Sequence, residues 1–116
     1  MGSILGEFEQ LVLLALLRLG ADAYGVTVQE EIERRSGRAV SAGTVYRALL
    51  RLESKAMVES WEGEPTPERG GRRKRHYRVL PEGRRTVVDS LAVLGRMAEG
   101  LEDLPSLPLG PQGTEA

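Results

Sequence analysis

The sequence predicts a mostly α-helical protein with one β-hairpin, and three observations support this fold class. Apolar residues recur at helical spacing in four segments, near residues 7–19, 24–36, 41–53 and 81–102. Two strand-like runs, 57–62 and 73–80, flank a loop rich in Gly and Pro, which is typical of a hairpin. A chain of 116 residues has the usual size of one domain with one modest core.

Composition excludes several kinds of protein. The chain has no cysteine, which excludes disulfides, thiolate metal sites and cysteine nucleophiles and fits a reducing, cytoplasmic location. The longest apolar run, Leu11 to Leu17, is too short to cross a bilayer, and no basic region precedes it as in a signal peptide. We therefore expect no membrane association.

The net charge of −1 is the sum of strongly charged segments of opposite sign. Segments 34–58 and 69–85 carry +5 and +7, whereas 1–33, 59–68 and 86–116 carry −5, −4 and −4. Local charge sets the field that a phosphate backbone meets. The two basic segments are therefore candidates for contact with nucleic acid, and the acidic ends are candidates for contact with protein.

The first two helices are expected to form much of the core. The segment Glu7–Leu19 is apolar nearly all round and is followed by Gly20, a helix-ending signal. Such a helix is normally buried on more than one side, so its second covering surface is a candidate for another subunit. The next helix, near 24–36, turns Val28 and Ile32 inward.

The third helix combines an apolar and a basic side. Ser41 is the expected N-cap, and Val45, Leu49 and Leu52 form the stripe expected to be buried. At about 100° per residue, the other side gathers small, hydroxyl and basic groups: Ser41, Thr44, Arg47, Ala48 and Arg51. This pattern suits a helix in the major groove of DNA. The alternative is an ordinary solvated amphipathic helix.

The hairpin carries a basic cluster at its second strand, formed by Arg72, Arg73, Lys74 and Arg75. Winged helix-turn-helix proteins bind duplex DNA with such a helix and the basic hairpin that follows it. These side chains would neutralise phosphates and supply affinity and salt sensitivity rather than sequence choice. The alternative is a charged edge strand that prevents aggregation.

The last helix shows the spacing of a short coiled-coil seam. Pro81 suits its first turn, and apolar residues follow at steps of 4, 3, 4 and 3: Val87, Leu91, Leu94, Ala98 and Leu101. So short a seam needs a partner helix. We therefore predict a winged helix-turn-helix DNA-binding domain over 1–80, a C-terminal dimerisation helix over 81–102 and a flexible tail over 103–116.

The order of these elements resembles the PadR family of bacterial transcriptional regulators over about residues 5–102. The segment Gly43–Glu53 is similar to the family's Gly-Thr-Leu-Tyr…Leu…Arg-Leu-Glu signature, and Leu11–Leu17, Tyr24-Gly25 and Tyr77–Gly83 match in order and spacing. Two positions depart from the pattern. Ala56 stands where many relatives have Gly, and Leu80 stands where a Thr usually caps the last helix.

The resemblance implies a homodimeric repressor that binds a palindrome near its own or a neighbouring promoter. In the family the last helix packs on the partner's first helix, which adds Leu11 and Leu14 to the dimerisation residues. In several relatives a small aromatic or drug-like molecule enters between the subunits and weakens DNA binding. Here Leu94 and Met97 would line such an effector pocket, and the helix has no aromatic residue.

We expect different contacts for individual side chains of the third helix and the hairpin. Arg47 is the candidate for a bidentate contact with guanine, while Ser41 and Thr44 are candidates for phosphate contacts. Tyr46 either packs in the core or, as in relatives, reaches a phosphate with its hydroxyl. Trp61 either packs under the wing or stacks on an effector.

An enzyme is not expected. The one histidine, His76, lies in a basic strand as an exposed bystander, and no carboxylates cluster on one face. The sequence therefore predicts no catalytic residue, metal site or cofactor. The alternative function is a winged helix that serves as a protein-interaction module through its acidic faces, without sequence-specific DNA binding.

Overall fold

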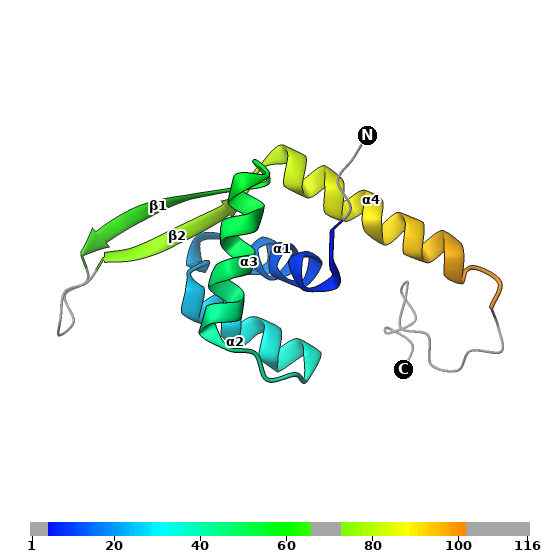
Figure 1. Cartoon of the computed structure of the whole chain (residues 1–116), viewed down its shortest axis with the longest axis horizontal. Coiled ribbons are helices and arrows are strands. Elements are labelled where there is room, and N and C mark those ends of the chain that lie inside the picture. The colour runs from blue at the N-terminus through cyan, green and yellow to red at the C-terminus, as the bar shows by residue number, and fades with distance from the viewer. Residues whose placement is uncertain (1–4, 66–72, 102–116) are drawn as a thin grey trace.

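The computed structural model describes residues 5–65 and 73–101. Its elements are α1 (Glu7–Leu19), a single 3-10 turn η1 (Gly20–Asp22), α2 (Gly25–Ser36), α3 (Ala42–Ser54), β1 (Val58–Pro65), β2 (Arg73–Val79) and α4 (Pro81–Ala98) (Figure 1). The predicted fold class, mostly α with one β-hairpin, is confirmed. The 103–116 tail lies outside the described residues.

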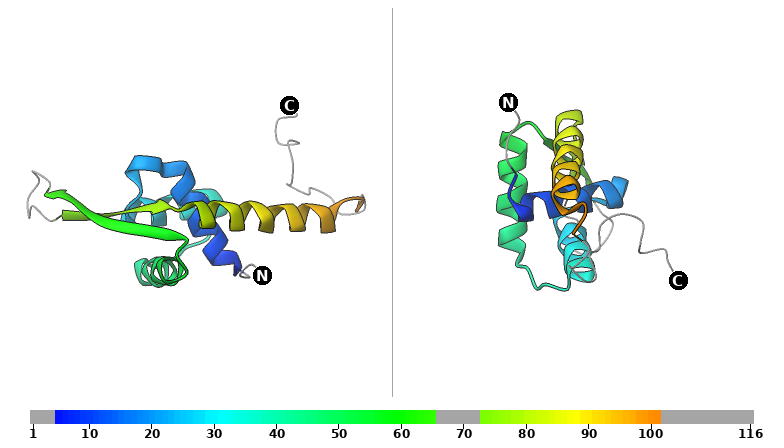
Figure 2. Two further views of the ribbon diagram at one scale, coloured as in Figure 1. Left: turned by 90° about the horizontal axis from the view of Figure 1, so that it is seen from above. Right: turned by 90° about the vertical axis from the view of Figure 1, so that its right-hand side faces the viewer.

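Three helices form a compact body from which two elements extend. The hairpin leaves this body on one side and α4 on the other (Figure 1). α3 lies at the outer edge and packs one side against α1 and α2 (Figure 2). Side chains of all of these elements meet in one core, whose fully buried members include Val12, Leu13, Val28, Leu49, Met57, Val58 and Val87. The core therefore covers one side of α3 and leaves the opposite side of this helix exposed to solvent.

Local signals in the sequence determine most helix ends. The Ser41 hydroxyl accepts a hydrogen bond from the Thr44 amide at 3.1 Å, which confirms Ser41 as the N-cap of α3. Gly20 and Gly37 follow α1 and α2 with positive φ angles of 58° and 74°. At the start of α4, Pro81 occupies the first turn as predicted, and Leu80 makes no side-chain cap.

The turn between α3 and β1 shows why glycine suits position 56, where this chain has alanine. Ala56 has a φ of +62°, a left-handed conformation that glycine adopts at no steric cost. A glycine at this position would relieve that strain. The alanine is nevertheless held in place because the amides of Ala56 and Met57 donate to the carbonyls of Glu53 and Leu52.

The hairpin is a two-stranded antiparallel sheet. Val58 pairs with Val79, Ser60 with Tyr77 and Glu62 with Arg75, and the register shifts between Glu62 and Pro65. β1 is longer than the predicted 57–62 because pairing with β2 continues into residues whose composition is that of a loop. The Tyr77 amide donates to the carbonyl of Ala23 at 3.0 Å, which fastens the hairpin to the body.

The structure corrects the prediction for Ala48. Its side chain is fully buried and does not belong to the outward side of α3. α3 contacts two helices, α1 and α2, so its buried side is wider than the stripe of Val45, Leu49 and Leu52. A side chain as small as that of Ala48 allows this close packing.

The structure also corrects two predictions for the last helix. Helix α4 ends at Ala98, and Leu101 lies beyond it after Gly100, which has a φ of +84°. Leu101 is therefore not part of a helical seam. Val87 is fully buried in the core of its own chain, so it is not a free dimerisation residue. No helix in the described part of the chain has the length and hydropathy to span a membrane.

Candidate nucleic-acid interface

The outward side of α3 carries polar, basic and apolar groups but no carboxylate. Its members are Ser41, Gly43, Thr44, Tyr46, Arg47, Leu50, Arg51 and Ser54. A guanidinium Nη of Arg47 lies 3.5 Å from the Thr44 hydroxyl, so these two side chains lie next to each other on this side. The one acidic residue of the helix, Glu53, accepts a hydrogen bond from the Ser60 hydroxyl of β1 at 2.7 Å. The exposed side of α3 is thus compatible with a polyanion.

A buried carboxylate holds the second half of α3. Glu9, in the first turn of α1, accepts hydrogen bonds from Arg51 Nε and Lys55 Nζ, each at 3.0 Å. Burial acts to raise the pKa of Glu9, but the hydrogen bonds from Lys55 and Arg51 outweigh it and lower the pKa. The Arg51 side chain remains 53% exposed, so it can still meet a ligand from the solvent side.

A groove joins α3 to the hairpin. It lies between the start of α2, α3 and β2 and is lined by Tyr24, Gly25, Val26, Thr27, Tyr46, Lys74, Arg75 and Tyr77. Three predicted DNA-contact residues, Tyr46, Lys74 and Arg75, therefore come together here. The start of α2 adds the positive end of a helix dipole, and no acidic residue lines the groove. Such a surface attracts a phosphate backbone.

Tyr46 does not belong to the core. Its side chain is 53% exposed at the edge of this groove. The alternative that its ring is buried is therefore wrong. The neighbouring Tyr77 is buried instead, and this burial raises the pKa of its hydroxyl.

The two groove cations are held by neighbouring side chains. Lys74 Nζ lies 4.5 Å from the ring centroid of Tyr24, a cation–π contact. Arg75 Nε donates to the Ser60 hydroxyl at 3.1 Å, and this hydroxyl donates in turn to Glu53 of α3. The position of Arg75 is thus linked to α3 through Ser60. Arg72 lies outside the described residues, and Arg73 is the first residue of β2.

The hairpin is electrically asymmetric. β1 carries Glu59, Glu62 and Glu64, whereas every charged residue of β2 is basic. Arg78 of β2 is ion-paired with Glu59 across the hairpin. The edge of β2 that carries Lys74 and Arg75 is therefore the part of the hairpin suited to phosphate.

Aromatic contacts join the middle of the hairpin to Tyr24 at the start of α2. The His76 ring stacks on Trp61 at 5.5 Å between centroids and meets Tyr24 edge-on at 4.9 Å. His76 is partly buried, so the prediction that it is exposed is wrong. A Cβ at Gly63 would clash with the His76 ring, so any larger residue there would require this ring to shift. Trp61 packs on this stack and on Arg78 but keeps an exposed edge.

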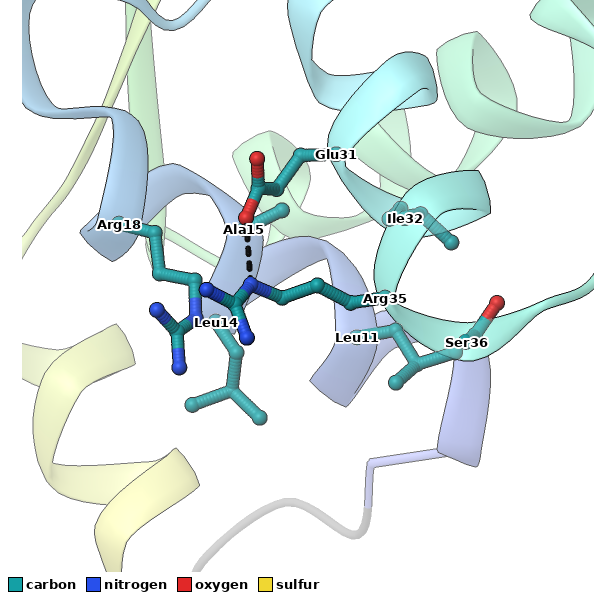
Figure 3. Close-up of a pocket in the computed structure, with 8 residues that line it drawn as sticks. All are labelled: Leu11, Leu14, Ala15, Arg18, Glu31, Ile32, Arg35 and Ser36. Carbon is teal, nitrogen blue, oxygen red and sulfur yellow. Dashed lines mark hydrogen bonds and ion pairs between the residues drawn. The ribbon is translucent and has the colours of Figure 1, made fainter.

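An open apolar hollow lies between α1 and α2. Leu11, Leu14, Ala15 and Ile32 line it, and Arg18 and Arg35 flank it (Figure 3). Arg35 Nε donates to the buried Glu31 carboxylate at 2.8 Å, which fixes one side of the hollow (Figure 3). Leu11 and Leu14, both predicted dimerisation residues, therefore lie side by side on an accessible surface.

The outer part of α4 is apolar and exposed. Leu91, Leu94 and Met97 are all accessible, and Met97 reaches 73% exposure. Only the first half of this helix has buried residues: Gly83, Thr86 and Val87. The described residues also contain no group of three metal-ligating side chains.

Comparison with known proteins identifies relatives of this fold. Residues 13–89 match the model of the transcriptional regulator PadR-like family. An uncharacterized protein of Lysinibacillus sphaericus is 30% identical over 83 residues, which cover 70% of this chain and 72% of the relative.

Two solved structures extend this likeness. A transcriptional regulator from Clostridium thermocellum has a TM-score of 0.67 at 21% identity, covering 84% of this chain and 91% of that one. A PadR family transcriptional regulator from Eggerthella lenta has a TM-score of 0.63 at 27% identity, covering 84% and 85%.

Proposed function

The chain belongs to the PadR-like family of transcriptional regulators, and we propose that it binds a specific double-stranded DNA sequence as a homodimeric repressor. The family consists of regulators and not of enzymes. One observation carries the proposal: the carboxylate-free side of α3 adjoins a groove that contains Tyr46, Lys74 and Arg75. A duplex can therefore meet α3 in its major groove and the β2 edge at its backbone.

Different residues of α3 would contact the bases and the phosphates of the DNA. Arg47 is central on the exposed side and can donate two hydrogen bonds to one guanine. Ser41 and Thr44, at the start of the helix, would bind phosphate. Arg51 would also contact phosphate, through the guanidinium nitrogens that its bond to Glu9 leaves open to solvent in the described structure.

The hairpin would hold the DNA backbone. Lys74 and Arg75 lie in the groove beside Tyr46, whose exposed hydroxyl can donate to a phosphate. Arg72 and Arg73 precede them in the chain and would extend the same contact along the backbone. These side chains would supply affinity without choosing a sequence.

The dimer would be built from α4 and α1. Leu91, Leu94 and Ala98 lie on one side of α4, and nothing in the described chain buries Leu91 or Leu94. The apolar hollow at Leu11 and Leu14 offers the complementary surface on a second copy. Two copies would present two α3 helices to a palindromic operator near the chain's own or a neighbouring promoter.

A small hydrophobic or aromatic effector would act at the same place, between subunits. Leu94 and Met97 expose the apolar surface for it, and the family resemblance supplies the expectation. A regulator of this kind is expected in the bacterial cytoplasm, where the DNA lies.

The test is selection of bound sites from random duplex DNA, followed by affinity measurements at several salt concentrations. The proposal expects a recurrent palindromic site and a steep fall of affinity as salt rises. Binding without sequence preference would instead favour the alternative, a winged helix that acts as a protein-interaction module.

A further inference from the structure

Leu50 is an apolar residue on the outward side of α3. Its side chain is 47% exposed. It belongs neither to the core nor to the partly buried apolar residues that pack on the core in the described structure. The side chain therefore has apolar surface that the folded chain itself does not cover.

The surroundings of Leu50 make its exposure informative. A single exposed leucine on a protein surface is ordinary. The midline of the exposed side of α3, however, runs opposite Val45. Leu50 lies close to this midline on one side, and Arg47 lies close to it on the other side. Tyr46 precedes Leu50 by one turn on the same side. A leucine thus occupies the centre of the surface proposed to enter the major groove.

The chemistry of the major groove restricts what Leu50 can contact. A leucine side chain cannot bind a phosphate or donate to a base edge. The thymine C5-methyl is the apolar group that base edges present there. We propose that Leu50 contacts a thymine methyl in each half-site and so adds to the sequence choice made by Arg47. This inference rests on the proposed DNA-binding function.

The helix geometry predicts the position of that thymine. Leu50 follows Arg47 by three residues, which is about 4.5 Å along the helix axis. Successive bases in DNA are about 3.4 Å apart along each strand. With the axis of α3 along the major groove, the guanine read by Arg47 and the thymine read by Leu50 should therefore lie in neighbouring base pairs, on the same or on opposite strands.

The experiment removes only the methyl group. Sites are first selected from random duplex DNA with the wild-type chain, and each conserved thymine is then replaced by deoxyuridine. Loss of the methyl that Leu50 contacts should weaken wild-type binding about fourfold, the effect of one methyl group that is no longer buried. The Leu50→Ala variant should bind equally well to sites that carry thymine or uracil at that position.

The control is Val93→Ala, which truncates an apolar residue of α4 that is as exposed as Leu50 and lies outside the proposed DNA-binding surface. This variant should keep the wild-type preference for thymine over uracil. Because Leu50 is exposed and alanine favours helices, Leu50→Ala should fold, and thermal melting checks this.

The outcomes separate this inference from the function on which it rests. Specific binding that no deoxyuridine replacement weakens overturns the role of Leu50 alone. The role of Leu50 is also overturned if every deoxyuridine replacement weakens the binding of Leu50→Ala as much as it weakens the binding of the wild-type chain. Failure to select any preferred site overturns the proposed function and the inference together.

Discussion

Arg51 Nε of α3 lies 3.0 Å from Glu9 Oε2 of α1, and this ion pair joins residues 42 positions apart in the chain. Lys55 Nζ contacts the same buried carboxylate. A buried charge is stable in a folded protein only when it is paired. The orientation of α3 relative to α1 therefore depends on an ion-pair cluster as well as on apolar packing.

The first prediction concerns this cluster. Glu9→Gln removes the charge but keeps the shape, so it should lower the free energy of unfolding by about 1.5–3 kcal/mol, the range for hydrogen bonds to charged groups. Urea denaturation at neutral pH measures the change. Glu7→Gln is the matched control because it removes the same charge from an exposed pair with Arg38, where the loss should be clearly smaller. Equal losses in the two variants would contradict a special role for Glu9.

The second prediction is a pH dependence of stability. The folded-state pKa of Glu9 is lowered, as are those of Glu7 and Glu31 through hydrogen bonds from arginines. Their stabilising contribution is therefore fully present above the unfolded pKa of about 4.3 and is lost as pH falls through the lower folded values. Stability measured from pH 6 downward should decline below about pH 4.3, and less steeply in Glu9→Gln. Parallel curves for the two proteins would show that Glu9 does not contribute.

The third prediction concerns base reading by Arg47. Arg47→Ala should cost about 1–3 kcal/mol in affinity for the selected site and relax the preference at one base position. Binding titrations with single-base variants of the site measure both effects. Arg85→Ala, which removes a cation from the exposed surface of α4, should leave the preference intact. If Arg47→Ala keeps full discrimination, another residue reads that base.

The fourth prediction concerns the hairpin. Lys74→Gln and Arg75→Gln should weaken binding to all DNA sequences similarly. Each should also reduce the slope of log affinity against log salt by about 0.9 for every phosphate that the variant no longer neutralises. Arg78→Gln is the control, since Arg78 is already paired with Glu59. An unchanged salt slope in the first two variants would mean that the β2 edge does not meet the backbone.

The fifth prediction concerns assembly. Leu94→Glu places a charge on the exposed apolar side of α4 and should convert the dimer into a monomer, as measured by light scattering at micromolar concentration. Ala92→Glu introduces the same charge near Arg96 and Arg85, on the side of α4 opposite Leu94, and should leave the dimer intact. A wild-type monomer under these conditions would refute the dimer itself.

The sequence by itself determined the secondary structure because its signals are local. The Ser41 cap, the stripe of Val45, Leu49 and Leu52, and Pro81 at the start of α4 each depend on neighbours within a few residues. Helical and strand periodicities act over the same range. The basic character of α3 and β2 could likewise be read from the chain.

Only the tertiary structure decided which groups meet across the chain. Sequence spacing does not show that Glu9 binds Arg51 and Lys55, or that His76 packs between Tyr24 and Trp61. It also does not show that the start of α2 completes the groove beside Tyr46. The prediction that Ala48 faces outward is wrong for the same reason, since the width of a buried helix side depends on how many neighbours pack against it. These features arise from contacts between distant segments, which form only when the whole core is assembled.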